Sequence, residues 1–101
     1  MKLTNQVYWN LVEALRRFTR FGHNPTLTEA LTGCGFKTEY KETVDKGYMV
    51  LGNENYGFRF RSASWLRLSP KGAEIVQRWL DQGFNYKKIE AGEYPDRKIE
   101  P

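Results

Sequence analysis

Residues 65–80 carry a pattern that is typical of a strand running directly into a capped helix. A short apolar segment around Leu66 is followed at once by Ser69 and Pro70. A serine hydroxyl accepts a hydrogen bond from a free N–H at a helix start, and proline fits the first helical position, where no N–H is needed. The predicted helix ends before Gly83, which suits a left-handed cap. Its apolar positions form one broad face: Ala73, Ile75, Val76, Trp79 and Leu80.

A second amphipathic helix is predicted near the start of the chain, over residues 4–21. Its apolar side chains recur at steps of three and four: Val7, Leu11, Ala14, Leu15 and Phe18. Glycine and proline in residues 22–25 end this helix. A short helix at 26–31 and a tight turn at 32–35 are expected to follow.

Residues 36–46 permit two interpretations. Phe36, Tyr40 and Val44 stand four apart, as on one face of a helix. The same residues also belong to an alternating pattern with threonines, which favours a strand. As a strand, the segment would pair with residues 48–51 and give a β-meander flanked by helices.

A β-hairpin is predicted between this region and the capped helix. Residues 47–51 begin the first strand, and residues 52–57 are rich in side chains that accept a positive φ, as a turn requires. Residues 58–61 alternate apolar and basic side chains, which indicates the second strand. Residues 62–64 are expected to bulge or loop.

Two short sequences, Gly47-Tyr-Met-Val and Leu68-Ser-Pro-Lys-Gly72, resemble the wing region of MarR-type and related small bacterial and phage DNA-binding regulators. The resemblance covers roughly residues 26–82 and implies an α+β, winged helix-turn-helix fold. The implied order is three helices, a β-hairpin wing and a C-terminal helix. In this order residues 36–46 are the recognition helix, which favours the helical interpretation of that segment.

The implied domain spans residues 1–83. Residues 84–101 are expected to form a C-terminal tail that docks in part through Phe84, Tyr86 and Ile89. From Ala91 onward the tail is polar and charged, and it is expected to be mobile.

The composition predicts one small domain without an enzymatic signature. The chain has 101 residues, of which 40% are hydrophobic and 28% charged. Cys34 is the only cysteine and His23 the only histidine, so we expect no catalytic residue, no metal site and no cofactor. Neither a signal-peptide pattern nor an apolar run of membrane-spanning length is present, which predicts a cytoplasmic protein without a membrane partner.

The formal net charge is +4, and the positive surplus gathers in the predicted wing and the first helix. Such a surplus suits the phosphates of duplex DNA. The expected DNA-binding residues come from the recognition helix, the wing and the first helix: Lys37, Thr38, Lys41, Glu42, Arg59, Arg61, Arg67, Arg16 and Arg20.

Two functions from different classes follow. The first is a small DNA-binding transcriptional regulator of bacterial, plasmid or phage origin, expected to be a homodimer. Its expected partner interface uses aromatic residues of the terminal segments: Tyr8, Trp9, Trp79 and Phe84. The alternative is a phage-type module that binds protein and inhibits a host complex without binding DNA. The basic wing favours the first function, and the balanced charge of residues 37–46 permits the second.

Overall fold

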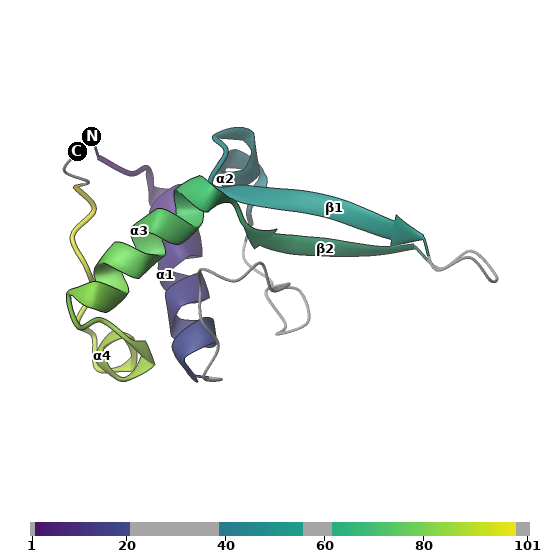
Figure 1. The fold of residues 1–101 in the computed structure, drawn as a ribbon. Coiled ribbons are helices and arrows are strands. Elements are labelled where there is room, and N and C mark those ends of the chain that lie inside the picture. The colour runs from purple at the N-terminus through teal and green to yellow at the C-terminus, as the bar shows by residue number, and fades with distance from the viewer. Residues whose placement is uncertain (1, 21–38, 56–61, 99–101) are drawn as a thin grey trace.

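The computed structural model describes residues 2–20, 39–55 and 62–98. They form an α+β fold in which helices and an antiparallel hairpin share one core (Figure 1). The elements run in the order α1 (Asn5–Arg20), α2 (Lys41–Asp45), β1 (Met49–Asn55), β2 (Ser62–Leu68), α3 (Pro70–Asp81) and α4 (Tyr86–Glu90). The helix expected at 26–31 and the turn expected at 32–35 lie outside the described residues.

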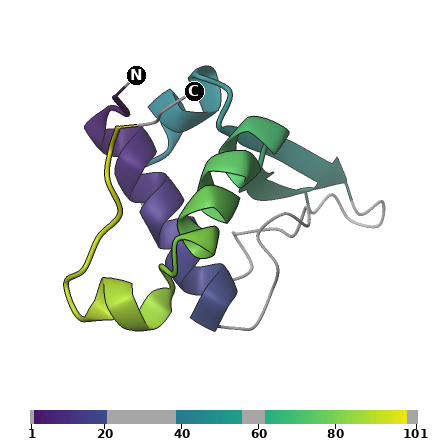
Figure 2. The ribbon, with the colours of Figure 1, turned by 60° about the vertical axis from the view of Figure 1, so that its left-hand side comes forward.

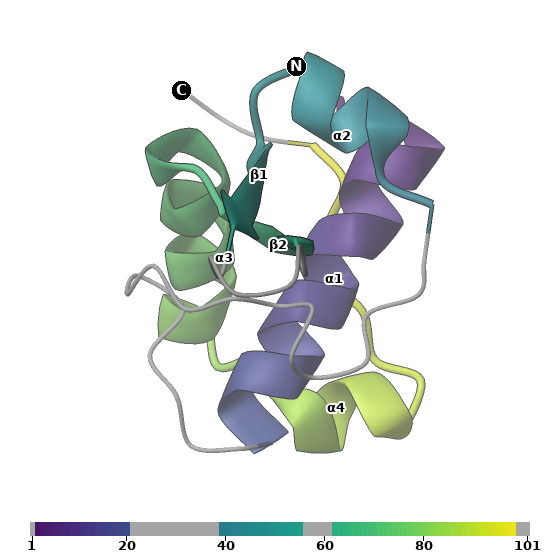
Figure 3. The same cartoon turned by 90° about the vertical axis from the view of Figure 1, so that its right-hand side faces the viewer.

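Helix α1 is the element against which the other helices pack. In Figure 3, α2 lies at its N-terminal end, α4 lies at its C-terminal end and α3 runs beside it. The predicted apolar face is confirmed, since all its members are buried: Val7, Leu11, Ala14, Leu15 and Phe18. Tyr8 and Val12 are buried as well, so the buried surface of α1 is wider than one stripe.

Helix α2 occupies part of the ambiguous segment. The strand interpretation is wrong for residues 39–46, because α2 spans Lys41–Asp45 and β1 pairs with β2 instead. Tyr40 and Val44 are half-buried against the core, as a helical face requires. Phe36 lies outside the described residues.

Side chains of α1 hold α2 in place. A helix of five residues is not stable alone, and Tyr40 at its start supplies no capping side chain. The Gln6 side-chain oxygen accepts from the Glu42 N–H at 2.6 Å, which satisfies one free donor of α2. The buried Asn10 amide donates to the Thr43 hydroxyl at 2.6 Å and to the Glu39 carbonyl at 2.9 Å. These bonds fix the position of α2 on α1.

Strands β1 and β2 form a hairpin that projects away from the helices (Figures 1 and 2). Its register runs from Met49 opposite Leu68 to Asn55 opposite Ser62. The ladder is therefore longer than predicted, because it includes residues 52–55 of the turn predicted at 52–57 and the bulge predicted at 62–64. Cross-strand hydrogen bonds outweigh the weak strand preference of asparagine and glycine here. Residues 58–61, the expected second strand, lie outside the described residues.

The junction between β2 and α3 is confirmed as a capped helix start. The Ser69 hydroxyl oxygen accepts from the Gly72 N–H at 3.2 Å, and Pro70 occupies the first helical turn. Gly83 follows the helix with φ +95°, the left-handed conformation expected of it. Gly72 is buried directly beneath the Tyr48 carbonyl, so the start of α3 packs against the backbone that enters β1.

The segment after α3 returns along α1. It forms α4, and residues 91–98, here called the returning segment, then run back toward the start of α1, shown in yellow in Figure 2. The Tyr8 hydroxyl donates to the Pro95 carbonyl, the Leu3 N–H donates to the Arg97 carbonyl at 3.1 Å, and Lys2 pairs with Lys98 in an isolated antiparallel bridge. Residues 91–98, for which mobility is expected from the sequence, pass along α1, where Tyr8 and the backbone near Leu3 supply hydrogen-bond partners.

Gly72→Ala is expected to destabilise the protein by about 2 kcal/mol, because the new methyl group would overlap the Tyr48 carbonyl oxygen. At an open helical position the same change would stabilise by up to about 1 kcal/mol. Urea unfolding measures the difference. Glu74→Ala, at an exposed position of the same helix, is the control and should change stability little. A Gly72→Ala protein at least as stable as the wild type would contradict the close approach.

Candidate nucleic-acid interface

The residues expected to bind DNA lie in separate parts of the fold. Lys37, Thr38, Arg59 and Arg61 lie outside the described residues. The others lie at three places: Lys41 and Glu42 on α2, Arg67 half-buried on β2, and Arg16 and Arg20 on α1.

The charges of α2 are balanced by ion pairs along the helix itself. Lys41 Nζ lies 2.9 Å from an Asp45 carboxylate oxygen, and Lys46 Nζ lies 3.8 Å from Glu42. The hydrogen bond that the Lys41 ammonium donates to Asp45 raises the pKa of Lys41 above its ordinary value. These side chains are exposed or half-buried, so the pairs are weak and exchange readily with other partners. Helix α2 thus presents polar groups without a surplus of positive charge.

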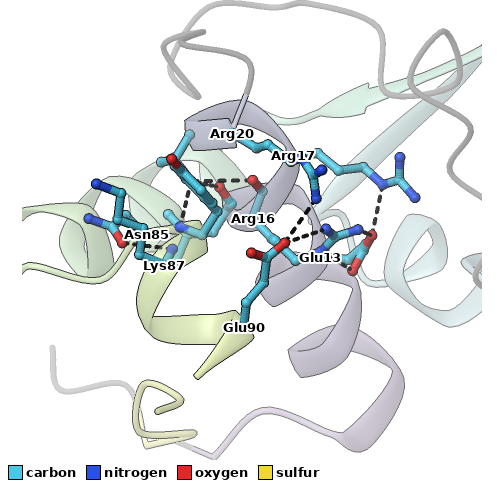
Figure 4. Close-up of polar contacts among 10 residues, drawn as sticks. Glu13, Arg16, Arg17, Arg20, Asn85, Lys87 and Glu90 are labelled. Atoms are coloured by element: carbon cyan, nitrogen blue, oxygen red, sulfur yellow. Dashed lines mark hydrogen bonds and ion pairs between the residues drawn. The ribbon is translucent and has the colours of Figure 1, made fainter. Parts of the chain in front are cut away.

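Arg16 and Arg20 lie toward the opposite end of α1 from α2. Asn10, which holds α2, precedes Arg20 by ten residues, or roughly 15 Å along the helix axis. Both arginines contact Glu90 of α4 (Figure 4). Arg16 Nη1 lies 3.4 Å and Arg20 Nη1 2.9 Å from the same Glu90 oxygen. The fold therefore separates these guanidinium groups from α2.

Glu13 holds a second pair of arginine contacts on the same side of α1. Its Oε1 lies 2.7 Å from Arg16 Nη2 and 2.7 Å from Arg17 Nε. Burial raises the pKa of Glu13. The hydrogen bonds and charges of Arg16 and Arg17 together lower this pKa by a larger amount, so the net shift is downward. The folded protein therefore favours the ionised carboxylate.

Helix α4, which supplies Glu90 to the arginines of α1, is not among the elements predicted from the sequence. Asn85 caps α4 by accepting from the N–H groups of Lys87 and Lys88, and the Thr19 hydroxyl accepts from the Tyr86 N–H at 2.9 Å (Figure 4). Asparagine two residues after a helix-ending glycine is a recognisable N-cap signal. That signal would have predicted α4, although not its place on α1.

A second group of cations lies at the root of the hairpin. Lys71 Nζ sits 4.2 Å from the centre of the Tyr48 ring and donates to the Lys46 carbonyl at 3.3 Å. Both lysines are exposed, and they flank the point where the chain enters β1 and leaves β2. Lys71 therefore contributes positive charge at the base of the projecting hairpin, where Lys46 is paired with Glu42.

The four residues expected to contact a partner have different surroundings. Tyr8 and Trp79 are core residues whose rings meet edge to face, with centroids 5.8 Å apart. Phe84 is half-buried. Trp9 is 40% exposed, and its ring packs against Tyr94 of the returning segment at 5.2 Å. Of these four, Trp9 exposes the largest aromatic surface.

Within the described ranges, no group of three or more His, Cys, Asp or Glu side chains is arranged to hold a metal ion. No helix in this part of the chain has the length and apolar character that crossing a membrane requires. Comparison with protein-family models, curated protein sequences and solved structures gave no match.

Glu13→Gln is expected to reduce the free energy of unfolding at neutral pH and to flatten its acid dependence. Because the folded pKa of Glu13 lies below the ordinary value of 4.5, its stabilising effect is full above that value and is lost as the pH falls through the folded pKa. The wild type and the variant should therefore converge in acid. Urea unfolding from about pH 7 to about pH 3 measures this.

The control for this measurement is Glu74→Gln, which removes a carboxylate paired with Arg78 and 68% exposed. We expect it to leave the pH profile nearly unchanged, since exposed pairs contribute little. A Glu13→Gln difference that stays constant across the pH range would contradict the lowered pKa.

Proposed function

We propose that this chain is a winged-helix domain that binds duplex DNA. The observation that carries the proposal is the projecting β1–β2 hairpin, which delivers the chain directly into the Ser69-capped α3. A hairpin that extends beyond the helical body can reach a neighbouring groove or backbone while the helices contact the duplex. A regulator of this kind would act in the cytoplasm.

The charge around the hairpin supports phosphate contact. The segment that joins β1 to β2 contains Arg59 and Arg61 in its sequence, and Lys46 and Lys71 lie at the hairpin root. Arginine and lysine side chains neutralise backbone phosphates independently of base sequence. The wing is therefore proposed as the principal phosphate-binding element.

The proposed binding mode relies on the DNA backbone more than on base edges. Helix α2 has five residues, and its acidic side chains Asp45 and Glu42 pair with Lys41 and with Lys46, which follows the helix. Lys41 and Glu42 can reach base edges only by giving up these pairs. We therefore expect modest sequence selectivity and strong salt dependence.

The double variant Arg59→Ala, Arg61→Ala is expected to weaken binding to all duplex sequences and to flatten the salt dependence. The slope of log affinity against log salt should fall by about one unit for each phosphate that the variant no longer neutralises. Fluorescence anisotropy with duplexes of unrelated sequence, over a salt series, measures both effects.

The matched control removes the same charge at another place. Lys2→Ala with Lys98→Ala changes two exposed lysines at the paired ends of the described chain, which lie far from the hairpin in Figure 1. This control should retain most of the affinity. Equal affinity of the wing variant and the wild type at low salt would rule out the wing as a DNA contact.

A second candidate function is a protein-binding module of the phage-inhibitor type. The observations that favour it are the balanced charge of α2 and the exposure of Leu51, Trp9 and Tyr94, at 44%, 40% and 47%. Exposed apolar side chains of this size suit a protein surface better than a phosphate backbone. Absence of duplex binding at low salt would favour this candidate.

Homodimer formation remains a prediction, and it now rests on Trp9. Trp9→Ala is expected to shift a dimer toward monomer, because Trp9 exposes the largest aromatic surface among the four expected interface residues. Light scattering at high micromolar concentration measures the assembly. Leu51→Ala, which shortens an exposed apolar side chain on β1, is the control. A monomeric wild type, with and without DNA, would contradict the dimer.

A further inference from the structure

Two guanidinium groups of α1 converge on one carboxylate oxygen that comes from the far end of the chain. Arg16 and Arg20 both approach Glu90 Oε1, at 3.4 and 2.9 Å, across sequence separations of 74 and 70 residues. Arginine donates charge-assisted hydrogen bonds to phosphate oxygens as it does to carboxylate oxygens, so a phosphate can take the place of Glu90 between the two guanidinium groups.

We propose that Glu90 is an internal competitor for a polyphosphate ligand, occupying Arg16 and Arg20 until a nucleic-acid backbone displaces it. The nucleic-acid part of this inference rests on the proposed function. The inference depends on binding of a chain of phosphates by Arg16 and Arg20 of α1 at the contact with Glu90 of α4. This group of side chains is called the arginine cluster, and its binding of phosphates can be tested separately.

The exposure of the cluster allows such an exchange. The side chains of Arg20 and Glu90 are 54% and 44% exposed and that of Arg16 is 23% exposed, so a ligand reaches the group from the side of Arg20. Ion pairs at this exposure contribute little to stability and are screened by salt. A phosphate chain with several charges can therefore replace one carboxylate.

The cluster keeps a surplus of positive charge while Glu90 is in place. Arg16 and Arg17 contact Glu13, and Arg16 and Arg20 contact Glu90 (Figure 4). Three guanidinium groups therefore face two carboxylates, which leaves a surplus of one positive charge. This surplus attracts an anion, and release of Glu90 increases it to two.

Helix α4 is held on α1 by contacts that do not involve Glu90. The buried Ile89 joins the core, and the Thr19 hydroxyl accepts from the Tyr86 N–H. Release of the Glu90 side chain therefore leaves α4 docked on α1. Displacement requires a side-chain movement and no unfolding of the segment.

The test compares Glu90→Gln with Glu93→Gln. Both variants remove one negative charge from the same segment, but Glu93 lies three residues beyond the arginine contacts and is exposed. Binding of each variant to a DNA duplex and to inorganic polyphosphate is measured over a salt series. Thermal unfolding checks that both variants are folded.

Glu90→Gln is expected to bind either polyanion about fivefold more tightly than Glu93→Gln at low salt, as the strength of two ion pairs at the protein surface allows. Its salt slope should steepen by about one unit, because one more phosphate is neutralised. The increase in affinity should disappear when Arg16→Gln and Arg20→Gln are also present, since these are the groups that Glu90 occupies.

The outcomes separate this inference from the proposed function. Tighter polyphosphate binding by Glu90→Gln, with no duplex binding by any variant, would support the competitor and overturn the DNA-binding role. Equal binding by the two glutamine variants on both probes would overturn the competitor, whatever the wing variant shows. If Glu90→Gln unfolds, Glu90→Asp provides the second test, because the shorter side chain withdraws the carboxylate from Arg16 and Arg20 and keeps its charge. Failure of Glu90→Asp to bind inorganic polyphosphate more tightly than the wild type would then overturn the inference.

Discussion

Burial of α1 on several sides is the constraint on which the rest of this fold depends. Its apolar face packs with α3 and the root of the hairpin, while its remaining sides receive α2, α4 and the returning segment. Short helices cannot persist without such support. The five-residue helices α2 and α4 therefore take their positions from α1 side chains, through Asn10 and Gln6 at one end and Thr19 at the other.

The sequence predicts those parts of the structure whose stabilising contacts are local. The apolar periodicity of α1, the Ser69 cap and the left-handed Gly83 are of this kind, and the structure confirms them. The place of residues 91–98 could not be predicted, because its contacts depend on partners at distant positions. The hydrogen bond from Tyr8 to Pro95 joins residues 87 positions apart, and no short sequence pattern predicts it.

The same distinction applies to the candidate interface. Periodicity identifies Arg16 and Arg20 as one polar stripe of α1, which is correct as a statement about the helix surface. It cannot identify Glu90 as their partner, since that contact is made by tertiary packing. Charge counted along the sequence therefore overstates the positive potential on α1. The proposed DNA contact accordingly depends more on the hairpin than on this helix.

The returning segment also has a consequence for the order in which the chain folds. Residue Arg97 is synthesised roughly 5–20 s after α1 at ordinary translation rates, because about 80 to 90 residues separate them. Until then, the surface formed by Tyr8 and Trp9 lacks its cover from Tyr94 and Arg97. Contacts of such long sequence separation also close slowly. A nascent chain therefore exposes an aromatic strip of α1, formed by Tyr8 and Trp9, until Tyr94 and Arg97 have been synthesised.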